Sequence, residues 1–319
     1  MSKHLQPIYR WGERCSRIGV LTTLAFLLIL KLFISEINLS LQLVIALVAL
    51  LIGIPHGAID HLISIPAHPR ARFFAFILIY IIIAVAAGWF IASWNVLGFQ
   101  CVVVMSALHF GYGDASFRNE ENDAHSRERN SFLIESAYAL PAGFIPVVLP
   151  LTDHRTLSAL TRIHPALENW AGTWVGALRF TTLASAVIGL IALLFTKKIA
   201  LCIDLILLTA LALIAPPLIA FATYFGLWHA LRHTARLVPK LAKADGLARA
   251  GNWMVALRAA ITPGLYAVIG TLAIAALLMI RSPGEFSSSL LWSTLVLIWA
   301  LTVPHMMATA RFDWLTLHK

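Results

Sequence analysis

The sequence predicts an all-α, polytopic integral membrane protein with about ten transmembrane helices in one bundle. Of its 319 residues, 60% are hydrophobic and only 12% are charged, whereas a soluble domain carries about 25% charged residues. Apolar stretches of about 18 or more residues recur along the whole chain, and each is long enough to cross a bilayer. No polar stretch is long enough for a soluble domain, so residues 1–319 are expected to form a single membrane-embedded domain.

Ten apolar segments define the expected helices. They cover residues 17–35, 39–56, 73–94, 96–112, 131–150, 174–196, 199–216, 218–234, 259–280 and 288–308. The first follows a basic start and lacks a small-residue cleavage site, so it is interpreted as a retained helix and not as a signal peptide. The fifth contains Pro141, Pro146 and Pro150, which predict kinks that neighbouring helices must accommodate.

The basic residues predict the orientation of the chain. If the N-terminus is cytoplasmic, 19 of the 24 lysines and arginines face the cytoplasm, and only Arg155, Arg162, Arg179 and Arg281 face the opposite side. Such an asymmetry is typical of a multi-pass protein of the cell (inner) membrane with both termini cytoplasmic. The net charge of +9 is thereby explained by the lipid bilayer as partner, without a nucleic acid.

Histidines stand near the cytoplasmic ends of four predicted helices. His56, His109 and His305 end three of them, and His229 and His233 end a fourth with the spacing i, i+4, which puts both rings on one helix face. Polar groups in apolar stretches are rare and usually functional. A bound metal explains the pattern best, and all-imidazole ligation suits iron, copper, zinc or nickel. His305 is a fifth ligand or a residue that supports the ligands.

Carboxylates near the same depth are candidates for supporting the ligands, because a metal-bound imidazole usually donates its other N–H to an oxygen acceptor. Asp204 and Glu135 lie inside apolar runs and are the favoured candidates. An ion pair with a nearby arginine is the equally open alternative for each acid. The full set of candidate supporting residues is Asp60, His61, Asp114, Glu135, Asp204 and His305.

Aromatic residues flank the histidine motifs and can line an apolar tunnel, or they can form an interfacial belt facing the lipid headgroups. If the helix is regular, Phe225 is four residues before His229 and shares its face. The candidate tunnel residues are Phe110, Tyr112, Tyr224, Phe225 and Trp228. The three cysteines, Cys15, Cys101 and Cys202, suggest neither a disulfide framework nor a thiolate metal site.

The run Gly53-Ile-Pro-His-Gly-Ala-Ile-Asp-His61 resembles the signature of the Brp/Blh family of integral membrane β-carotene 15,15′-dioxygenases. The motif His109-Phe110-Gly111 with Asp114, and Trp228-His229 with His233, resemble the later motifs of that family. The resemblance implies one Fe(2+) held by His56, His109, His229 and His233. It also implies O2-dependent cleavage of the central 15,15′ double bond of β-carotene into two all-trans-retinal, with a retinal-accepting protein as an expected partner.

Two other classes of protein stay open. Di-iron lipid desaturases and hydroxylases also use spaced histidines, but they need more of them, often in adjacent pairs, and this chain has no His-His pair. A non-enzymatic metal or haem transport protein is the third class. Haem usually needs a second pair of axial histidines at the other face of the bundle, and the sequence lacks it.

Overall fold

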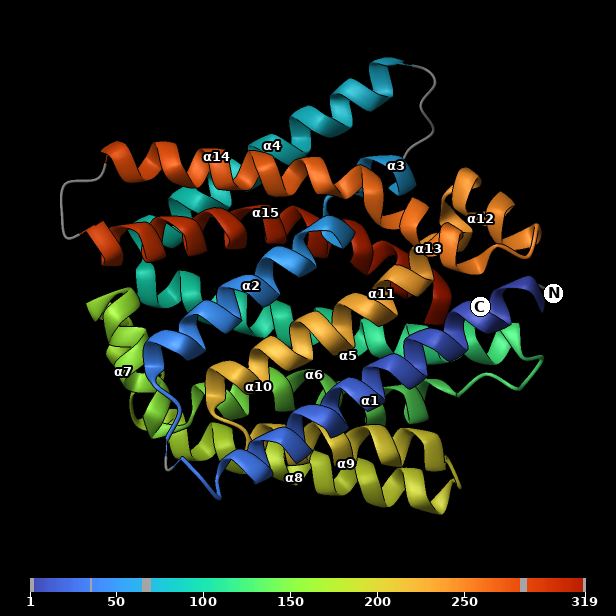
Figure 1. Cartoon of the computed structure of the whole chain (residues 1–319), viewed down its shortest axis with the longest axis horizontal. Helices are drawn as coiled ribbons and strands as arrows, with labels where there is room; N and C mark the ends of the chain where they lie inside the picture. Colours follow the sequence, from blue (N-terminus) through green and yellow to red (C-terminus); the bar gives the residue numbers. More distant parts are fainter. Residues whose placement is uncertain (1–2, 35, 65–69, 282–285, 318–319) are drawn as a thin grey trace.

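The computed structural model describes residues 3–34, 36–64, 70–281 and 286–317, and throughout these ranges the chain is helical or irregular, with no β-strand (Figure 1). The long helices are α1 (Gln6–Leu30), α2 (Leu39–Gly57), α4 (Arg70–Ser93), α5 (Asn95–Ala124), α6 (Phe132–Leu151), α8 (Val175–Phe195), α9 (Ile199–Ile214), α14 (Leu265–Arg281) and α15 (Phe286–Leu317). The shorter ones are α3 (Asp60–Ser64), α7 (His154–Ile163), α10 (Pro217–Thr223), α11 (Ala230–Leu237), α12 (Ala242–Arg249) and α13 (Trp253–Ile261).

Each of the ten predicted apolar segments falls on a helix or a run of consecutive helices, although Ser35, the end of the first segment, lies outside the described residues. In the described part of the chain, seven helical stretches are long and apolar enough to cross a membrane. The other three segments fall short for physical reasons. The first half of α1 is charged, α9 has only 16 residues, and the run from α10 to α11 contains the polar residues His229, Arg232 and His233.

The outer surface of the bundle is apolar. Large hydrophobic side chains on α1, α4 and α8 are more than half exposed, among them Phe26, Val85, Phe180 and Phe195. A soluble protein rarely exposes so much contiguous apolar surface, whereas a bilayer covers it. The interior, in contrast, holds buried charged groups such as Asp204 and Arg232. This inverted distribution agrees with an all-α membrane protein.

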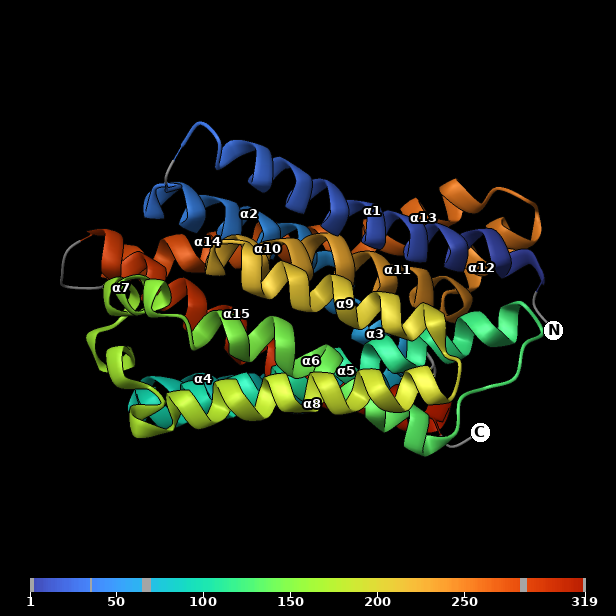
Figure 2. The same cartoon turned by 90° about the horizontal axis from the view of Figure 1, so that it is seen from below.

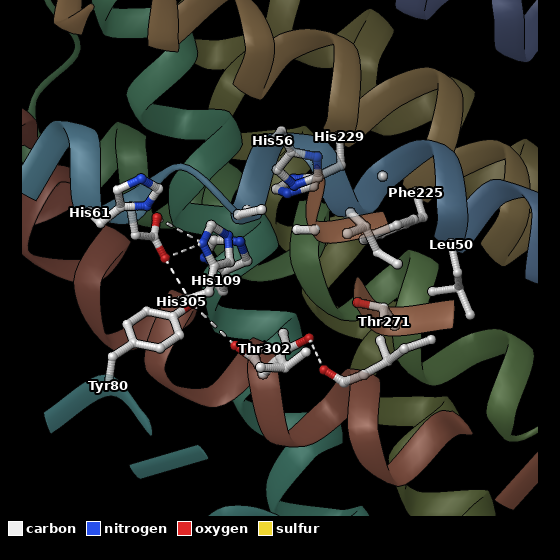
Figure 3. Close-up of a pocket in the computed structure, with 18 of the residues that line it drawn as sticks. Leu50, His56, His61, Tyr80, His109, Phe225, His229, Thr271, Thr302 and His305 are labelled. Atoms are coloured by element: carbon white, nitrogen blue, oxygen red, sulfur yellow. Dashed lines mark hydrogen bonds and ion pairs between the residues drawn. The ribbon is translucent and has the colours of Figure 1, made fainter. Parts of the chain in front are cut away.

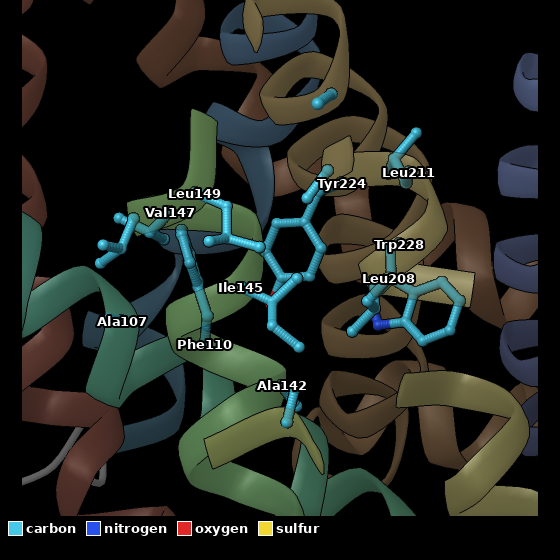
Figure 4. Close-up of a cluster of buried hydrophobic side chains, with 14 of the residues drawn as sticks. Ala107, Phe110, Ala142, Ile145, Val147, Leu149, Leu208, Leu211, Tyr224 and Trp228 are labelled. Atoms are coloured by element: carbon cyan, nitrogen blue, oxygen red, sulfur yellow. The ribbon is translucent and has the colours of Figure 1, made fainter. Parts of the chain in front are cut away.

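Helices α5 and α6 are in direct backbone contact, and this contact fixes the position of α5. A Cβ atom at Gly111 would lie 2.0 Å from the carbonyl oxygen of Ala139, and a Cβ atom at Gly143 would lie 1.8 Å from that of Ala107. Only glycine permits such an approach at both positions. The apolar core beside this contact joins α5 and α6 to α9 and to the Tyr224–His229 segment (Figure 4).

The first turn of α1 and the last turn of α15 lie at the same end of the bundle, beside α12 and α13, whereas α7 lies at the opposite end (Figures 1 and 2). A chain whose two ends lie on one side of a bundle crosses that bundle an even number of times. The end of the bundle that holds the first turn of α1 and the last turn of α15 is here called the first end. The end that holds α7 is called the second end.

Candidate metal centre

Five histidine side chains from four separate regions of the chain meet inside the bundle. They are His56 of α2, His109 of α5, His229 and His233 on either side of the junction with α11, and His305 of α15. Each is buried, with between 2% and 8% of its surface exposed. Figure 3 shows four of them, His56, His109, His229 and His305, around one cavity. The sequence motifs that are up to 249 residues apart are therefore neighbours in space.

The spacing of the imidazole rings suits a shared metal ion. Two imidazoles on one metal, with metal–nitrogen bonds of about 2.1 Å and ring centres about 1.1 Å beyond, have their centres roughly 4.5 to 6.5 Å apart. The ring centre of His56 lies 5.2 Å from that of His229 and 4.9 Å from that of His233. The ring centre of His109 lies 5.1 Å and 6.3 Å from the same two rings. These distances all fall inside the window.

Several ring nitrogens in this cluster are buried and have no hydrogen-bond partner. They are Nδ1 of His56, Nε2 of His229, both nitrogens of His233, and Nε2 of His305. Buried polar atoms without partners are costly, and a metal ion would satisfy these ones. Within the described ranges, however, no three of the His, Cys, Asp or Glu side chains are arranged so that they could hold a metal ion as they stand. The imidazole donors nevertheless fit a metal in kind and in proximity.

His305 belongs to the cluster itself. Its ring centre is 5.9, 5.2 and 5.7 Å from those of His56, His109 and His233. Its Nδ1 lies 3.0 Å from Oδ2 of Asp60, and Tyr80 donates a hydrogen bond to the same carboxylate oxygen at 3.1 Å. A carboxylate on one imidazole nitrogen and an unpaired second nitrogen is the arrangement found in carboxylate–histidine–metal sites.

Two polar neighbours of the histidines were not expected from the sequence. The hydroxyl of Thr309 lies 3.1 Å from Nδ1 of His109, and Tyr80 holds Asp60 from α4. Thr309 could have been identified from the sequence, because it is four residues after His305 and thus on the same helix face. Tyr80 could not, because it lies in the middle of a long apolar run.

The other predicted supporting residues lie elsewhere. Asp204 accepts hydrogen bonds from Arg17 and Arg118, and Asp114 accepts one from the indole of Trp228 at 2.6 Å. Glu135 accepts a hydrogen bond from Asn119. None of these three acids contacts a histidine of the cluster in the described structure.

His61 lines the same cavity and packs against the ring of Phe73, with ring centres 6.1 Å apart.

A layer of buried ion pairs holds the helix that carries His229 and His233. On α11, Arg232 pairs with Asp204 at 3.0 Å, and Arg236 pairs with Asp313 at 2.7 Å. The guanidinium of Arg232 also stacks over the indole of Trp228 at 3.7 Å. The predicted alternative for Asp204, an ion pair with arginine, is therefore the observed role, and its effect on the histidines is indirect.

The segment before α11 is a π-helix, Tyr224–His229, and not the regular helix that the sequence suggested. π-Helical turns are rare and frequently mark functional sites. Phe225 nevertheless lies beside His229, with ring centres 6.1 Å apart and planes inclined by only 21°. Gly53 of α2 makes room for this ring, because a Cβ atom at Gly53 would lie 1.9 Å from Cε1 of Phe225.

Four histidines of the cluster, all but His233, border a mostly apolar cavity of about 290 Å³, here called the histidine cavity. It lies among α2, α4, α5, α14, α15 and the π-helix, and its lining includes Leu50, Phe76, Ile81, Phe110, Phe225 and Ile298. Of the predicted tunnel residues, Phe110 and Phe225 line it. Tyr112, Tyr224 and Trp228 do not, and Tyr224 and Trp228 are fully buried in the core behind the histidines (Figure 4).

Comparisons with known proteins agree on one family. Residues 47–313 match the family described as beta-carotene 15,15′-dioxygenase. The chain is 31% identical over 192 residues to the beta-carotene 15,15′-dioxygenase of an uncultured marine bacterium (66A03), with 57% of this chain and 64% of the relative covered. It is 26% identical over 298 residues to a probable beta-carotene 15,15′-dioxygenase, Blh, of Halobacterium salinarum, with 83% and 82% covered. The aligned part thus spans less than two thirds of the marine relative. No solved structure matches the chain.

Proposed function

The chain belongs to the beta-carotene 15,15′-dioxygenase family, and we propose that it cleaves β-carotene with O2 at the central 15,15′ double bond, giving two molecules of all-trans-retinal. The atoms balance, because one carbon–carbon double bond and one O2 become two aldehydes. The observation that carries the proposal is the buried cluster of five imidazoles beside an apolar cavity. A hydrocarbon dissolved in the bilayer requires such a combination of an apolar cavity and a reactive centre.

We propose that His56, His109, His229 and His233 hold one Fe(2+) ion and that His305 supplies a fifth nitrogen. Iron(II) bound by neutral ligands would supply the chemistry of O2 activation. Asp60 would keep the proton of His305 on Nδ1 and leave Nε2 as the donor, and Thr309 would do the same for His109. The apolar lining of the histidine cavity would exclude water from the reacting carbons.

The whole-chain function is tested in cells that make β-carotene. Expression of this chain should bleach the orange colour and produce retinal, and the purified protein should contain one iron per chain. Two metals per chain would favour the di-iron class of desaturases and hydroxylases. Unbleached cells with the protein present in the membrane would overturn the proposed activity.

We also propose that the chain crosses the cell membrane ten times with both termini in the cytoplasm, and that the released retinal passes to a retinal-accepting protein. The asymmetry of the basic residues supports this orientation, together with the meeting of the chain ends at one end of the bundle. Reporter fusions after Ala215 and after Lys243 should therefore report opposite sides of the membrane. The same side for both would contradict the ten-span arrangement.

Replacing Asp60 by asparagine should weaken iron binding about 10- to 100-fold, the usual scale for the loss of a partner that orients a metal-bound imidazole. The substitution keeps the shape of the side chain but removes the charge that faces Nδ1 of His305. Tyr80→Phe keeps the charge of Asp60, removes the hydrogen bond to it and a longer one to the carbonyl of Leu301, and should have a smaller effect. Iron titrations of the purified proteins measure both, and identical titrations for Asp60→Asn and the unaltered protein would remove Asp60 from the site.

Replacing Phe225 by alanine should loosen the position of the polyene, because the ring lines the histidine cavity beside His56 and His229, at 5.9 and 6.1 Å between ring centres. A displacement of 1 Å can cost about 100-fold in rate, so turnover should fall and aldehydes longer than retinal should appear. Gly53→Ala displaces the same ring from the other side and should give the same products. Chromatography of the products measures both variants, and retinal alone at the original rate would show that Phe225 does not contact the substrate.

A further inference from the structure

A second cavity lies beyond the histidine cavity and has no role in the arrangement described so far. Here called the inner cavity, it has a volume of about 160 Å³ and is enclosed by α2, α5, α6, α7, α10 and α15. Its lining is apolar except for Ser106 and Thr156, and the hydroxyl of Thr156 already donates a hydrogen bond to the carbonyl of Pro150. A site with this lining suits a hydrocarbon and offers almost nothing to a polar ligand.

The same helix faces line both cavities. On α2, residues at spacings of three and four continue from one cavity into the other: Leu43, Ala46, Leu47, Leu50, Gly53 and Gly57. On α15 the corresponding residues are Leu295, Trp299, Thr302 and His305. Because residues at this spacing share one face of a helix, the two cavities lie end to end along the helix axes.

Two further helices repeat the pattern. On α5 the stripe is Phe99, Val102, Ser106 and His109, and along α10 and the π-helix it is Leu218, Phe221, Phe225 and His229. All four stripes begin in the inner cavity and end at a histidine or the residue next to one. The two cavities therefore follow one another along these helices, with the histidines at one end of the row and α7 at the other.

Apolar and aromatic side chains lie where the two cavities meet. Leu50 borders both of them. Phe225 of the histidine cavity stacks on Phe221 of the inner cavity, with ring centres 5.8 Å apart and planes inclined by 11°. These flat and apolar side chains suit contact with the flat, conjugated polyene part of a carotenoid.

The combined length fits one arm of a carotenoid. From Leu43 to Gly57 the α2 stripe rises about 20 Å, at roughly 1.5 Å per residue. An extended carbon chain advances about 1.2 Å per bond, so the nine bonds from the central double bond to the ring span about 11 Å, and roughly 15 Å with the ring included. A ring placed in the inner cavity thus leaves the central bond beside the histidines.

We propose that the inner cavity binds one terminal ring of the carotenoid and that α7 is the stop that selects the double bond to be cut. This deepens the proposed function and rests on it. An unsubstituted hydrocarbon has no polar handle, so its register along the channel must come from a steric stop. Ala159, Leu160 and Ile163 of α7 supply that stop, and each is buried at the far end of the channel.

The stop is testable by filling the inner cavity. Ala159→Leu adds volume at the α7 end, and Ser106→Leu adds it from the α5 wall, so the test does not depend on one variant being stable. Ala166→Leu, on an exposed residue shortly after α7, is the matched control. The unaltered protein and the control should release only retinal. Each filled variant should release two aldehydes of unequal length and lose about 10- to 100-fold in rate, because the substrate is displaced by more than 1 Å. Iron content and melting temperature of each variant are measured in parallel.

The outcomes separate the two proposals. If both filled variants retain iron, fold and retinal as the sole product at the original rate, the inner cavity is not the ring site, while the proposed function stands. If the iron-loaded, unaltered protein cleaves no β-carotene, the proposed function fails. The role of the inner cavity is then tested by measuring β-carotene binding to the protein in nanodiscs. Binding is monitored through the shift in carotenoid absorption. Weaker binding to the filled variants would support the ring site, and equal binding would overturn it.

Discussion

Replacing His233 by alanine is expected to abolish both iron binding and β-carotene cleavage. Both nitrogens of this ring are buried without a hydrogen-bond partner, and its centre lies within 6.3 Å of the four other rings of the cluster. A structural role in packing alone would leave these nitrogens unsatisfied, whereas a metal would use one of them. The loss of a direct ligand should exceed the 10- to 100-fold effect of losing a residue that only orients one.

The measurement is iron content after purification, together with retinal formation in membranes. His154→Ala is the matched control, because the side chain of His154 is 88% exposed at the opposite end of the bundle, and it should leave both quantities near normal. His56→Ala, His109→Ala and His229→Ala should behave like His233→Ala. Full iron content in the His233→Ala protein would remove this residue from the ligand set.

The gathering of the histidines was predictable because a membrane fixes one coordinate of each helix. Hydropathy locates the ends of the apolar segments, and the basic residues decide which ends face the same side. His56, His109 and His305 follow from these two signals alone, and the i, i+4 spacing supplies His229 and His233. The five rings come together only because the helices are arranged side by side in a particular order. That order depends on packing such as the contact of α5 with α6 at Gly111 and Gly143, which no local sequence pattern predicts.

The partners of the histidines were predicted less well. Asp60 and His305 are 245 residues apart, and only the packing of α15 against α3 makes them a pair. Asp204 was favoured because an acid inside an apolar run needs a partner, and this reasoning was sound. Its partners are arginines of α1, α5 and α11 and not the histidines. The sequence alone does not decide which of the two kinds of partner an acid in an apolar run contacts.

The candidate tunnel residues show that aromatic residues close together in the sequence do not all line the same cavity. Tyr224, Phe225 and Trp228 stand within five residues, but a helix turns by about 100° at each step, so they cannot all face one cavity. Phe225 faces the histidine cavity, while Tyr224 and Trp228 point into the core. The π-helix that sets these directions has no dependable signature in a single sequence, because it results from how α10 and α11 pack against α2.

Replacing Asp204 by alanine should destabilise the whole bundle by about 3–5 kcal/mol, the range for breaking a buried ion pair by removing one partner. Asp204 is fully buried and pairs with Arg17, Arg118 and Arg232. Arg17 and Arg118 retain Glu13 as a second partner. Among the described residues, Arg232 then keeps one carboxylate, Asp114 at 3.9 Å, and hydrogen bonds to the hydroxyls of Ser16 and Tyr138. Because Arg232 is itself 1% exposed and its remaining carboxylate is distant, it bears most of the loss.

The comparison is with Asp123→Ala, which removes the ion pair to Arg129 at 2.6 Å from a side chain that is 48% exposed. Such a partly exposed pair contributes about 0–1 kcal/mol, so thermal unfolding in detergent should separate the two variants clearly. Because Arg232 precedes His233 on α11, Asp204→Ala should also weaken iron binding, and Asp123→Ala should not. Equal melting temperatures for the two variants would mean that the buried arginines find other partners, and the ion-pair layer would then not be what holds the histidine helix in place.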